Sequence, residues 1–491
     1  MLTPNLVVTL ISPETGRPRP TVLEALPEPL TAAEHGLMVG VPVPADKRVH
    51  HGNWTAWPNI RWALTHMDEL RASGRISRGP GPADPLPPTE PAETGIDLDG
   101  LAIDNGSGGA WTLDEMLYRT YTDAFLVLHR GKVVDERYFN GMGSSTRHGM
   151  FSMTKTVTGV LALLAVEDGA MGLDDPVVDH VPELADTAYA PTTVRNLLDM
   201  TDGIRFVEDY ADNGSDIHRY AVAMAFTPVP EDWDGPDGIH EAILGFQARS
   251  EVPGEVFLYK SVTTDVLAWV TARATGRRWI DGVSEGIWGP MGAEEDAMVI
   301  LDNHGIAVSS GGMSCTVRDL ARFGRMLGRS GRVGEGADER QVIPTPVADD
   351  LVAGGEPYPG SGGGYPTREG WTFHRQFLEP AAGNGGVHAH GCARPTPVLP
   401  PGEGPGGSQV RVAPGDRKRF HRRDPRVALP STPGALLYRD AGSGGIRPRT
   451  RLCRLPRWPA RRCPGWPSGP RRMGRCPAPP GRPTFRPPAC P

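Results

Sequence analysis

The sequence predicts an α+β protein: an antiparallel β-sheet flanked by helices, with a mainly helical insert and a disordered C-terminal tail. Two observations indicate the sheet and its helices. Apolar residues at 125–128 and 133–134 flank a glycine-containing turn, which is typical of a β-hairpin. An apolar run with helical spacing follows at 157–165, and strands and helices do not alternate regularly along the chain.

Composition places the chain among ordinary globular proteins. It has 491 residues, of which 38% are hydrophobic and 22% charged, enough to bury a substantial core. No stretch approaches the roughly 18 consecutive apolar residues that a membrane span needs. The apolar start, residues 1–11, has no basic flank and no small-residue cleavage site. We therefore expect a cytoplasmic protein without a signal peptide and without membrane contact.

The chain divides into three parts by composition. Residues 1–115 form an extension rich in proline and glycine, with one helical candidate at 62–72, and no chemistry is evident in it. Residues 116–391 carry the strand and helix patterns of a folded domain. Residues 392–491 form a tail with 20 Arg, 1 Lys and 4 acidic residues, a net charge of +17. Subtracting this from the whole-chain charge of −7 leaves −24 for residues 1–391.

The tail permits three interpretations. It could be a disordered basic arm that binds nucleic acid or an acidic partner. It could be a disulfide module, although its five cysteines are an odd number and no strand pattern separates them. It could also be the product of a shifted reading frame in GC-rich DNA. Back-translated one nucleotide on, the run 392–401 permits Val-His-Gly-Gln-His-Leu-Tyr-Phe-His-Pro, which resembles a strand closed by a turn. We favour the shifted frame, and the first and third interpretations both predict no packed core there.

Further helices follow along the folded part. The buried helix at 157–165 ends at Gly169 and Gly172. Thr193 can cap a short helix at 194–200, and helices are predicted at 264–274 and 317–327.

Ser152 and Lys155 are the central candidates for chemistry. They are three residues apart at the start of the buried helix, so their side chains share one helix face. A helix N-terminus offers free backbone N–H groups to a developing oxyanion. Lysine, with a usual pKa of about 10.4, acts as a base at neutral pH only where its surroundings favour the neutral amine. The alternative is a capping serine beside a solvated lysine, but the apolar run at 157–165 argues against a lysine placed for solubility.

Several phrases together resemble the serine β-lactamase and penicillin-binding-protein superfamily. The similarity is greatest to the class C-like branch that contains the 6-aminohexanoate-dimer (nylon-oligomer) hydrolases and related esterases, and it spans about residues 110–391. The phrases are Phe151-Ser152-Met153-Thr154-Lys155-Thr156, TVRNLLDMTDG at 193–203, Glu208-Asp209-Tyr210, Tyr259-Lys260-Ser261 with Thr264-Asp265-Val266-Leu267, and Gly311-Gly312-Met313-Ser314 leading to Arg318-Asp319-Leu320-Ala321-Arg322-Phe323-Gly324. The resemblance implies a β-lactamase/transpeptidase-like fold.

The resemblance also implies roles for individual residues. Ser152 would be the acylated nucleophile and Lys155 its base, while Tyr259 would pass a proton to the leaving group. Ser261 would occupy the position where many relatives have Asn. Tyr210 would close over the substrate, although it could equally be a surface aromatic. No cofactor and no metal are implied.

A third superfamily motif lies at the edge of the tail. In this branch it reads approximately Gly-x-His-Gly-Gln and lines the substrate site. The chain reaches Ala389-His390-Gly391 and then departs from the pattern, whereas the shifted frame would continue it. If the tail stands as written, the oxyanion hole is incomplete, and losing one of its donors costs about 100- to 1,000-fold in rate.

Other clusters are weaker candidates. His388, His390 and Cys392 lack further ligands at metal-binding spacing. The acidic stretch that contains Asp202, Glu208, Asp209, Asp212 and Asp216 is expected to be a solvated loop, or else to attract a substrate ammonium group.

The sequence thus predicts a serine hydrolase that cleaves small linear amides or esters through an acyl-enzyme. Its partner would be a small-molecule substrate, with nucleic acid the less favoured partner and the oligomeric state undetermined. Two alternatives remain: a catalytically impaired family member whose basic tail binds nucleic acid or an acidic partner, and a β-lactamase or DD-peptidase.

Overall fold

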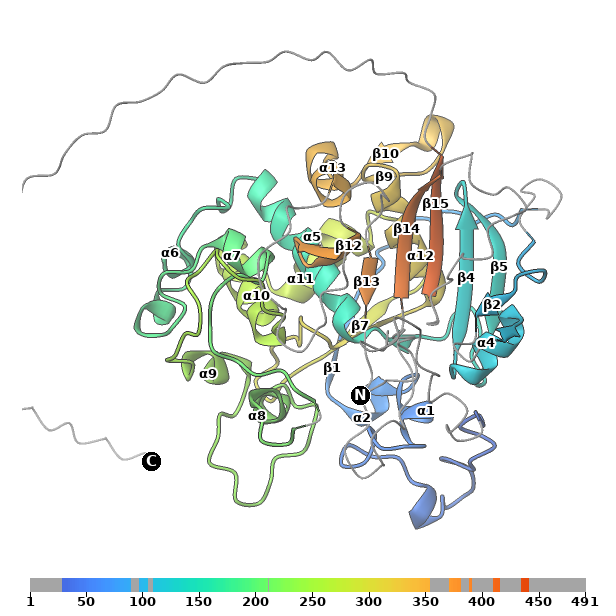
Figure 1. The fold of residues 1–491 in the computed structure, drawn as a ribbon, viewed down its shortest axis with the longest axis horizontal. Coiled ribbons are helices and arrows are strands. Elements are labelled where there is room, and N and C mark those ends of the chain that lie inside the picture. Colours follow the sequence, from blue (N-terminus) through green and yellow to red (C-terminus); the bar gives the residue numbers. More distant parts are fainter. Residues whose placement is uncertain are drawn as a thin grey trace, which may run out of the picture. The chain divides into compact units, whose positions relative to one another are not determined.

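The computed structural model describes residues 29–89, 97–104, 109–210, 212–353, 371–380, 388–390, 409–415 and 434–440. All of them belong to one compact unit, Met1–Ala441, which Figure 1 shows as a large sheet with helices packed beside it. None of the helices among these residues is long and apolar enough to cross a membrane.

The larger sheet has seven strands in the order β11-β12-β13-β14-β15-β4-β5 (Figure 1). Its strands are β4 (Ala124–His129), β5 (Lys132–Tyr138), β11 (Trp371–His374), β12 (Phe377–Pro380), β13 (His388–His390), β14 (Gln409–Gly415) and β15 (Gly434–Asp440). The predicted hairpin is confirmed as β4–β5, with Arg130 and Gly131 at positive φ in its turn. The expected antiparallel pairing holds for four of the six pairs, whereas β14–β15 and β15–β4 are parallel.

Two stretches of the tail are strands of the larger sheet. Residues 409–415 and 434–440 are strands, and β15 pairs with β4 along residues 435–438. Leu126 and Leu128 of β4 are fully buried, and a buried strand must have its backbone groups paired on both sides. The rest of the tail, for which the sequence predicts disorder, lies outside the described residues. The five tail cysteines lie outside the described residues.

A second, antiparallel sheet of four strands supports the start of the helical region. Its order is β1-β7-β8-β6, with β1 (Ser73–Ile76), β6 (His148–Gly149), β7 (Ala297–Ile300) and β8 (Met313–Cys315). The backbone N–H of Met150, just after β6, donates to the Met313 carbonyl over 2.8 Å. This pairing fixes where the chain enters the turn that contains Ser152.

The predicted helices are found with small changes of boundary. α7 (Val194–Leu198) has the expected Thr193 cap, completed by Asn196 as a capping box. α10 (Ser261–Thr275) and α12 (Val317–Gly328) extend the predicted ranges. The predicted helix at 62–72 is instead two single turns, α1 (Ile60–Ala63) and α2 (Met67–Leu70), because the backbone of His66 between them is not helical.

The other elements are the long central helix α5 (Thr154–Glu167), which is the predicted buried helix, and shorter helices, turns and strands around it. The shorter elements are η2 (Ala45–Lys47), β2 (Ile103–Asp104), β3 (Ala110–Trp111), α4 (Leu113–Arg119), η3 (Phe151–Met153), α6 (Val177–His180), η4 (Pro182–Asp186), α8 (Asp216–Ala223), α9 (Ile239–Leu244), α11 (Trp279–Val283), η5 (Ser284–Trp288), β9 (Arg332–Val333), η6 (Gly336–Asp338), β10 (Arg340–Gln341) and α13 (Thr345–Ala353).

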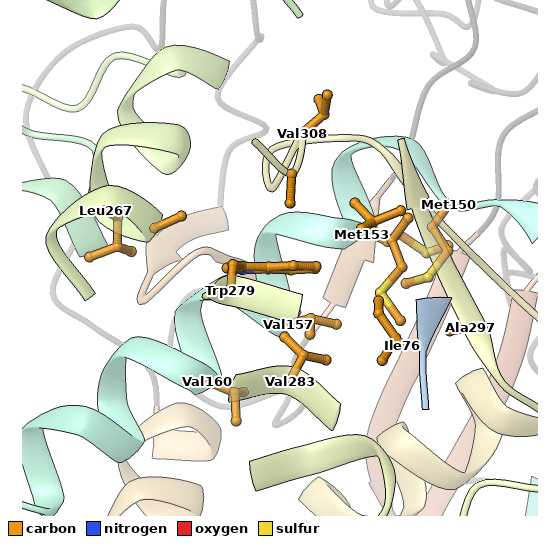
Figure 2. Close-up of a cluster of buried hydrophobic side chains, with 14 of the residues drawn as sticks. Ile76, Met150, Met153, Val157, Val160, Leu267, Trp279, Val283, Ala297 and Val308 are labelled. Carbon is orange, nitrogen blue, oxygen red and sulfur yellow. The ribbon is translucent and has the colours of Figure 1, made fainter. Parts of the chain in front are cut away.

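The main core surrounds α5. Figure 2 shows Met153, Val157 and Val160 packed with Trp279 and Val283, and all five side chains are buried. Removing such side chains from water stabilises the fold by roughly 1.5–3 kcal/mol each. The same core includes residues of the N-terminal segment, among them Ala32, Trp54, Ile60, Leu64 and Ile76. The segment for which the sequence indicates no chemistry is therefore part of the folded body.

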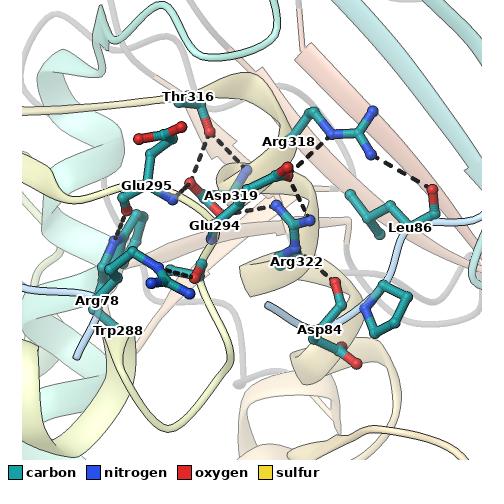
Figure 3. A network of polar contacts seen from close by, with 12 residues as sticks. Arg78, Asp84, Leu86, Trp288, Glu294, Glu295, Thr316, Arg318, Asp319 and Arg322 are labelled. Atoms are coloured by element: carbon teal, nitrogen blue, oxygen red, sulfur yellow. Dashed lines mark hydrogen bonds and ion pairs between the residues drawn. The ribbon is translucent and has the colours of Figure 1, made fainter. Parts of the chain in front are cut away.

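A buried polar network ties α12 to its surroundings (Figure 3). Asp319 accepts the backbone N–H groups of Glu294 and Glu295 over 2.7 and 3.0 Å, and it pairs with Arg322. Arg322 also donates to the Asp84 carbonyl over 2.8 Å. Because these groups satisfy one another out of water, the network fixes α12 against residues that precede the larger sheet.

Candidate active site

Ser152 lies in the 3-10 turn η3, which leads directly into α5. The sequence predicts it in the first turn of the α-helix itself; the α-helix begins two residues later. Phe151, immediately before Ser152, has φ +46°, in the left-handed region that bulky residues rarely adopt. Strained backbone of this kind persists where the surroundings impose it, often at functional sites.

Lys155 brings three segments of the chain together. Its side chain is 2% exposed. The Nζ atom lies 3.1 Å from Ser152 Oγ, 3.0 Å from Ser261 Oγ and 2.7 Å from the Ser310 carbonyl oxygen. The structure therefore joins Ser152, Lys155 and Ser261 as the sequence predicts, and it adds the Ser310 carbonyl, which sequence reasoning missed.

Glu208 is a further member that sequence reasoning did not place in the site. Its Oε2 accepts the backbone N–H of Ser261 over 2.6 Å, and its Oε1 accepts the Ser261 hydroxyl over 2.8 Å. The Tyr210 hydroxyl donates to the same Oε1 over 2.6 Å. Tyr210 thus lies at one end of a chain of hydrogen bonds that reaches Lys155 through Glu208 and Ser261.

These contacts determine how a neutral Lys155 would be oriented. The Ser310 carbonyl can only accept a hydrogen bond, and Ser261, whose proton goes to Glu208, accepts from Lys155 as well. A neutral amine has two protons and one lone pair. If a neutral Lys155 donates both protons to these two oxygens, its lone pair is the group left to accept the Ser152 proton. The arrangement suits removal of the serine proton.

Tyr259 lies beside the amine. Its side chain is 5% exposed, and the centre of its ring is 5.1 Å from Lys155 Nζ. The edge of the ring also meets Phe373 of β11, with centroids 6.4 Å apart. The structure thus brings the third predicted catalytic residue to the same cluster.

Asp265 on α10 holds the loop that supplies the Ser310 carbonyl. Its carboxylate accepts the Ser310 N–H over 2.9 Å, and the hydroxyls of Ser309, Ser310 and Tyr220 over 2.7, 2.7 and 2.8 Å. Complete burial raises the pKa of the Asp265 carboxyl, while these hydrogen bonds oppose the rise.

The acidic stretch is only partly the solvated loop that the sequence predicts. Asp209 and Asp212 are exposed, as expected. Asp202 is instead completely buried, where it forms an ion pair with Lys260 and accepts the Thr263 hydroxyl over 2.7 Å. The prediction is therefore wrong for Asp202, because a buried lysine one residue after Tyr259 requires a buried carboxylate.

The third motif is described in part. Strand β13 lies against η3, the turn that carries Ser152. Gly391 lies outside the described residues. Within the described part of the chain, no group of three or more His, Cys, Asp or Glu side chains could hold a metal ion.

Comparison with known proteins agrees with this geometry. The beta-lactamase family model matches residues 113–396, more than half of the chain. The chain belongs to the beta-lactamase family. It is 34% identical over 303 residues to a 6-aminohexanoate-dimer hydrolase from Paenarthrobacter ureafaciens, covering 62% of this chain and 72% of that protein.

One solved structure supports the same assignment. A protein assigned as a 6-aminohexanoate-dimer hydrolase, from Bacillus anthracis, superposes with a TM-score of 0.63 and 29% identity over 71% of this chain and 87% of its own. A penicillin-binding protein homologue from Pyrococcus abyssi matches with a TM-score of 0.42 and 19% identity over 57% of this chain and 67% of its own. The chain is thus a serine hydrolase of the beta-lactamase family with a β-lactamase/transpeptidase-like fold.

Proposed function

We propose that this hydrolase cleaves small linear amides or esters of the 6-aminohexanoate-dimer type, with Ser152 as nucleophile, Lys155 as base and Tyr259 as proton carrier. The relative from Paenarthrobacter ureafaciens is named for such a dimer. The observation that carries the proposal is the orientation of Lys155. If the neutral amine donates to Ser261 and Ser310, its lone pair is left to accept the proton of Ser152 Oγ, 3.1 Å away.

The proposed reaction has two steps. In acylation, Ser152 Oγ bonds to the substrate carbonyl carbon as its proton passes to Lys155 Nζ. The bond from that carbon to the leaving nitrogen or oxygen then breaks, and Tyr259 hands the leaving group a proton that Lys155 replaces. In deacylation, water attacks the ester on Ser152 and releases the carboxylic acid and the free serine.

Substrate contacts are proposed for Tyr210, Ser261 and Gly391. Glu208 holds the Tyr210 hydroxyl and Ser261 together, which supports a wall of the substrate site built from these two residues. A carboxylate at this wall would also attract the ammonium group of an aminohexanoate chain. Gly391 is proposed from the third sequence motif alone.

Labelling with a fluorophosphonate tests the nucleophile. The probe forms an Oγ–P bond with an activated serine and releases fluoride. We expect labelling of the wild type and none of Ser152→Ala. Ser250→Ala, which removes an exposed hydroxyl, is the matched control and should label like the wild type. Equal labelling of Ser152→Ala would refute the nucleophile.

Turnover then tests the substrate class. The linear 6-aminohexanoate dimer and a short p-nitrophenyl ester should be hydrolysed with a higher kcat/KM than a chromogenic β-lactam. A preference for the β-lactam would favour the β-lactamase alternative. Absence of labelling and turnover in a folded protein would favour the impaired family member with a basic tail.

A further inference from the structure

An aromatic cluster connects the N-terminal segment to the nucleophile turn. The Trp54 ring stacks on Phe151 with centroids 6.4 Å apart and planes within 10°. Its other stacking partner is Phe226, at 5.9 Å, and the Trp54 indole N–H donates to the Phe226 carbonyl over 2.8 Å. Trp54 is 2% exposed, so the ring faces protein rather than substrate. Three segments distant in sequence therefore meet at the residue before Ser152.

The same cluster touches the loop that holds Lys155. A Cβ atom placed on Gly311 would lie 3.8 Å from Phe226 Cζ and 3.9 Å from the carbonyl carbon of Phe151. Gly311 directly follows Ser310, whose carbonyl accepts from Lys155. The Phe226 ring thus lies beside Gly311 and the Trp54 ring stacks on Phe151, so the cluster borders the residues that adjoin Ser310 and Ser152.

Phe151 needs such support. Its φ of +46° is disfavoured for a bulky side chain, and the next residue carries the reacting hydroxyl. If the Phe151 ring were free to move, the backbone could relax out of the left-handed region, and the Ser152 side chain would then leave its position 3.1 Å from Lys155 Nζ. Stacking of the Phe151 ring on a fixed Trp54 opposes that relaxation.

We propose that Trp54 is a positioning residue for catalysis, holding Phe151 in the left-handed conformation that directs Ser152 toward Lys155. This inference rests on the proposed function, because an effect of Trp54 on the reaction rate requires Ser152 to be the nucleophile. It gives the N-terminal segment a part in the chemistry, because residues 29–89 supply the ring that fixes the nucleophile turn. The indole hydrogen bond to Phe226 anchors Trp54 itself, and His51 adds a contact with the Ala225 carbonyl at 3.1 Å.

A double-mutant cycle separates positioning from general stability. Trp54→Ala should lower the second-order rate constant of fluorophosphonate labelling by about 10- to 100-fold, since misplacement by an ångström can cost 100-fold. Trp54→Phe keeps an aromatic ring and should retain most of the rate. In a Phe151→Gly background, where φ +46° carries no penalty, Trp54→Ala should cost far less. Equal losses in both backgrounds would refute the proposal.

Trp57→Ala is the matched control. Trp57 belongs to the same segment and packs edge-on against Tyr121, 5.0 Å away, rather than on the nucleophile turn. It should lower the melting temperature without slowing labelling of the folded protein. If Trp54→Ala does not fold, Trp54→Leu, which is apolar but has no ring, takes its place in the cycle. A folded Trp54 variant without a ring that labels at the wild-type rate would overturn the inference.

Hydrogen exchange tests positioning without any reaction. In Trp54→Ala, the amides of Ser152 and Met153 should exchange faster, while those of α12 should not change. Unchanged exchange at Ser152 and Met153 refutes the positioning role even if the wild type proves unreactive. Absence of labelling in the wild type, with faster exchange in the variant, would instead refute the proposed function alone.

Discussion

Lys155 and Lys260 are both buried lysines beside the same helix, α10, yet their surroundings differ. Lys260 is completely buried, pairs with the Asp202 carboxylate and donates to the Ile204 carbonyl over 3.2 Å. Among its contacts with described residues, Lys155 hydrogen-bonds to the neutral oxygens of Ser152, Ser261 and Ser310.

The difference shows how one residue type serves two purposes. Lys260 pairs with the buried Asp202 carboxylate and donates to the Ile204 carbonyl, so its role is to hold the 202–204 loop against α10. The neutral hydroxyl and carbonyl oxygens around Lys155 carry no negative charge that would favour the ammonium form. One of them belongs to Ser152, the residue that must lose a proton in the proposed reaction. Burial alone therefore does not identify a catalytic lysine; the chemistry of its neighbours does.

Replacing Lys155 should have the largest effect on activity. Lys155→Met removes the base, and we expect labelling of Ser152 and ester hydrolysis to fall by about 10²- to 10⁴-fold. The free energy of unfolding should fall by about 1–3 kcal/mol, because the buried Ser310 carbonyl loses its donor. Stopped-flow labelling and urea unfolding measure the two quantities. Lys132→Met, at an exposed position, is the control. Near-wild-type labelling of Lys155→Met would remove Lys155 from the mechanism.

Replacing Lys260 should mainly lower the free energy of unfolding and affect labelling much less than Lys155→Met does. Lys260→Met leaves the Asp202 carboxylate buried without its ammonium partner, which should cost about 3–5 kcal/mol of the free energy of unfolding. Adding Asp202→Asn should recover part of this loss, since the asparagine oxygen can still accept from Ile204 N–H while its NH2 group donates to the Thr263 hydroxyl oxygen. Urea unfolding measures both variants. A loss of labelling in folded Lys260→Met as great as in Lys155→Met would erase the distinction between the two lysines.

Glu208→Gln should have a smaller effect and sharpen the same distinction. The carboxylate keeps the Ser261 proton directed away from Lys155, and glutamine does so less well. We expect about a tenfold slower acylation, because a hydrogen bond to a charged group contributes about 1.5 kcal/mol or more. Ser261→Ala should cause a comparable loss, and the double variant should be no worse than the poorer single one. Additive losses would show that Glu208 acts independently of Ser261.

The sequence predicts the nucleophile, the lysine and the α+β fold because these depend on local patterns. Helical spacing places Ser152 and Lys155 on one face, and the apolar run after them implies a buried helix. Glu208 could not be found in this way: in sequence it is one acid among several, and only the fold brings it within 2.6 Å of the Ser261 N–H. The contacts of Trp54 with Phe151 and of β15 with β4 likewise join segments far apart in the chain.

Replacing Asp265 should have the smallest effect, because Asp265 contacts Ser310, whose carbonyl in turn accepts a hydrogen bond from Lys155. Burial raises the pKa of its carboxyl above the usual 3.8, against the opposing hydrogen bonds from Ser309, Ser310 and Tyr220. As pH rises above about 4, the unfolded chain releases this proton before the folded one does, so the carboxyl destabilises the fold progressively until the folded pKa is passed. Asp265→Asn does not titrate.

The stability of Asp265→Asn relative to wild type should therefore increase from pH 4 upward and then level off. Urea unfolding of both proteins at half-unit steps measures the difference, and other titrating groups cancel because both chains share them. Any hydrogen bond that asparagine makes less well adds a constant offset that does not vary with pH. A difference that stays flat across the range would mean that the folded carboxyl ionises as readily as the unfolded one. The four hydrogen bonds would then outweigh burial, and Asp265 would stand as an anion beneath the Ser310 carbonyl and Lys155.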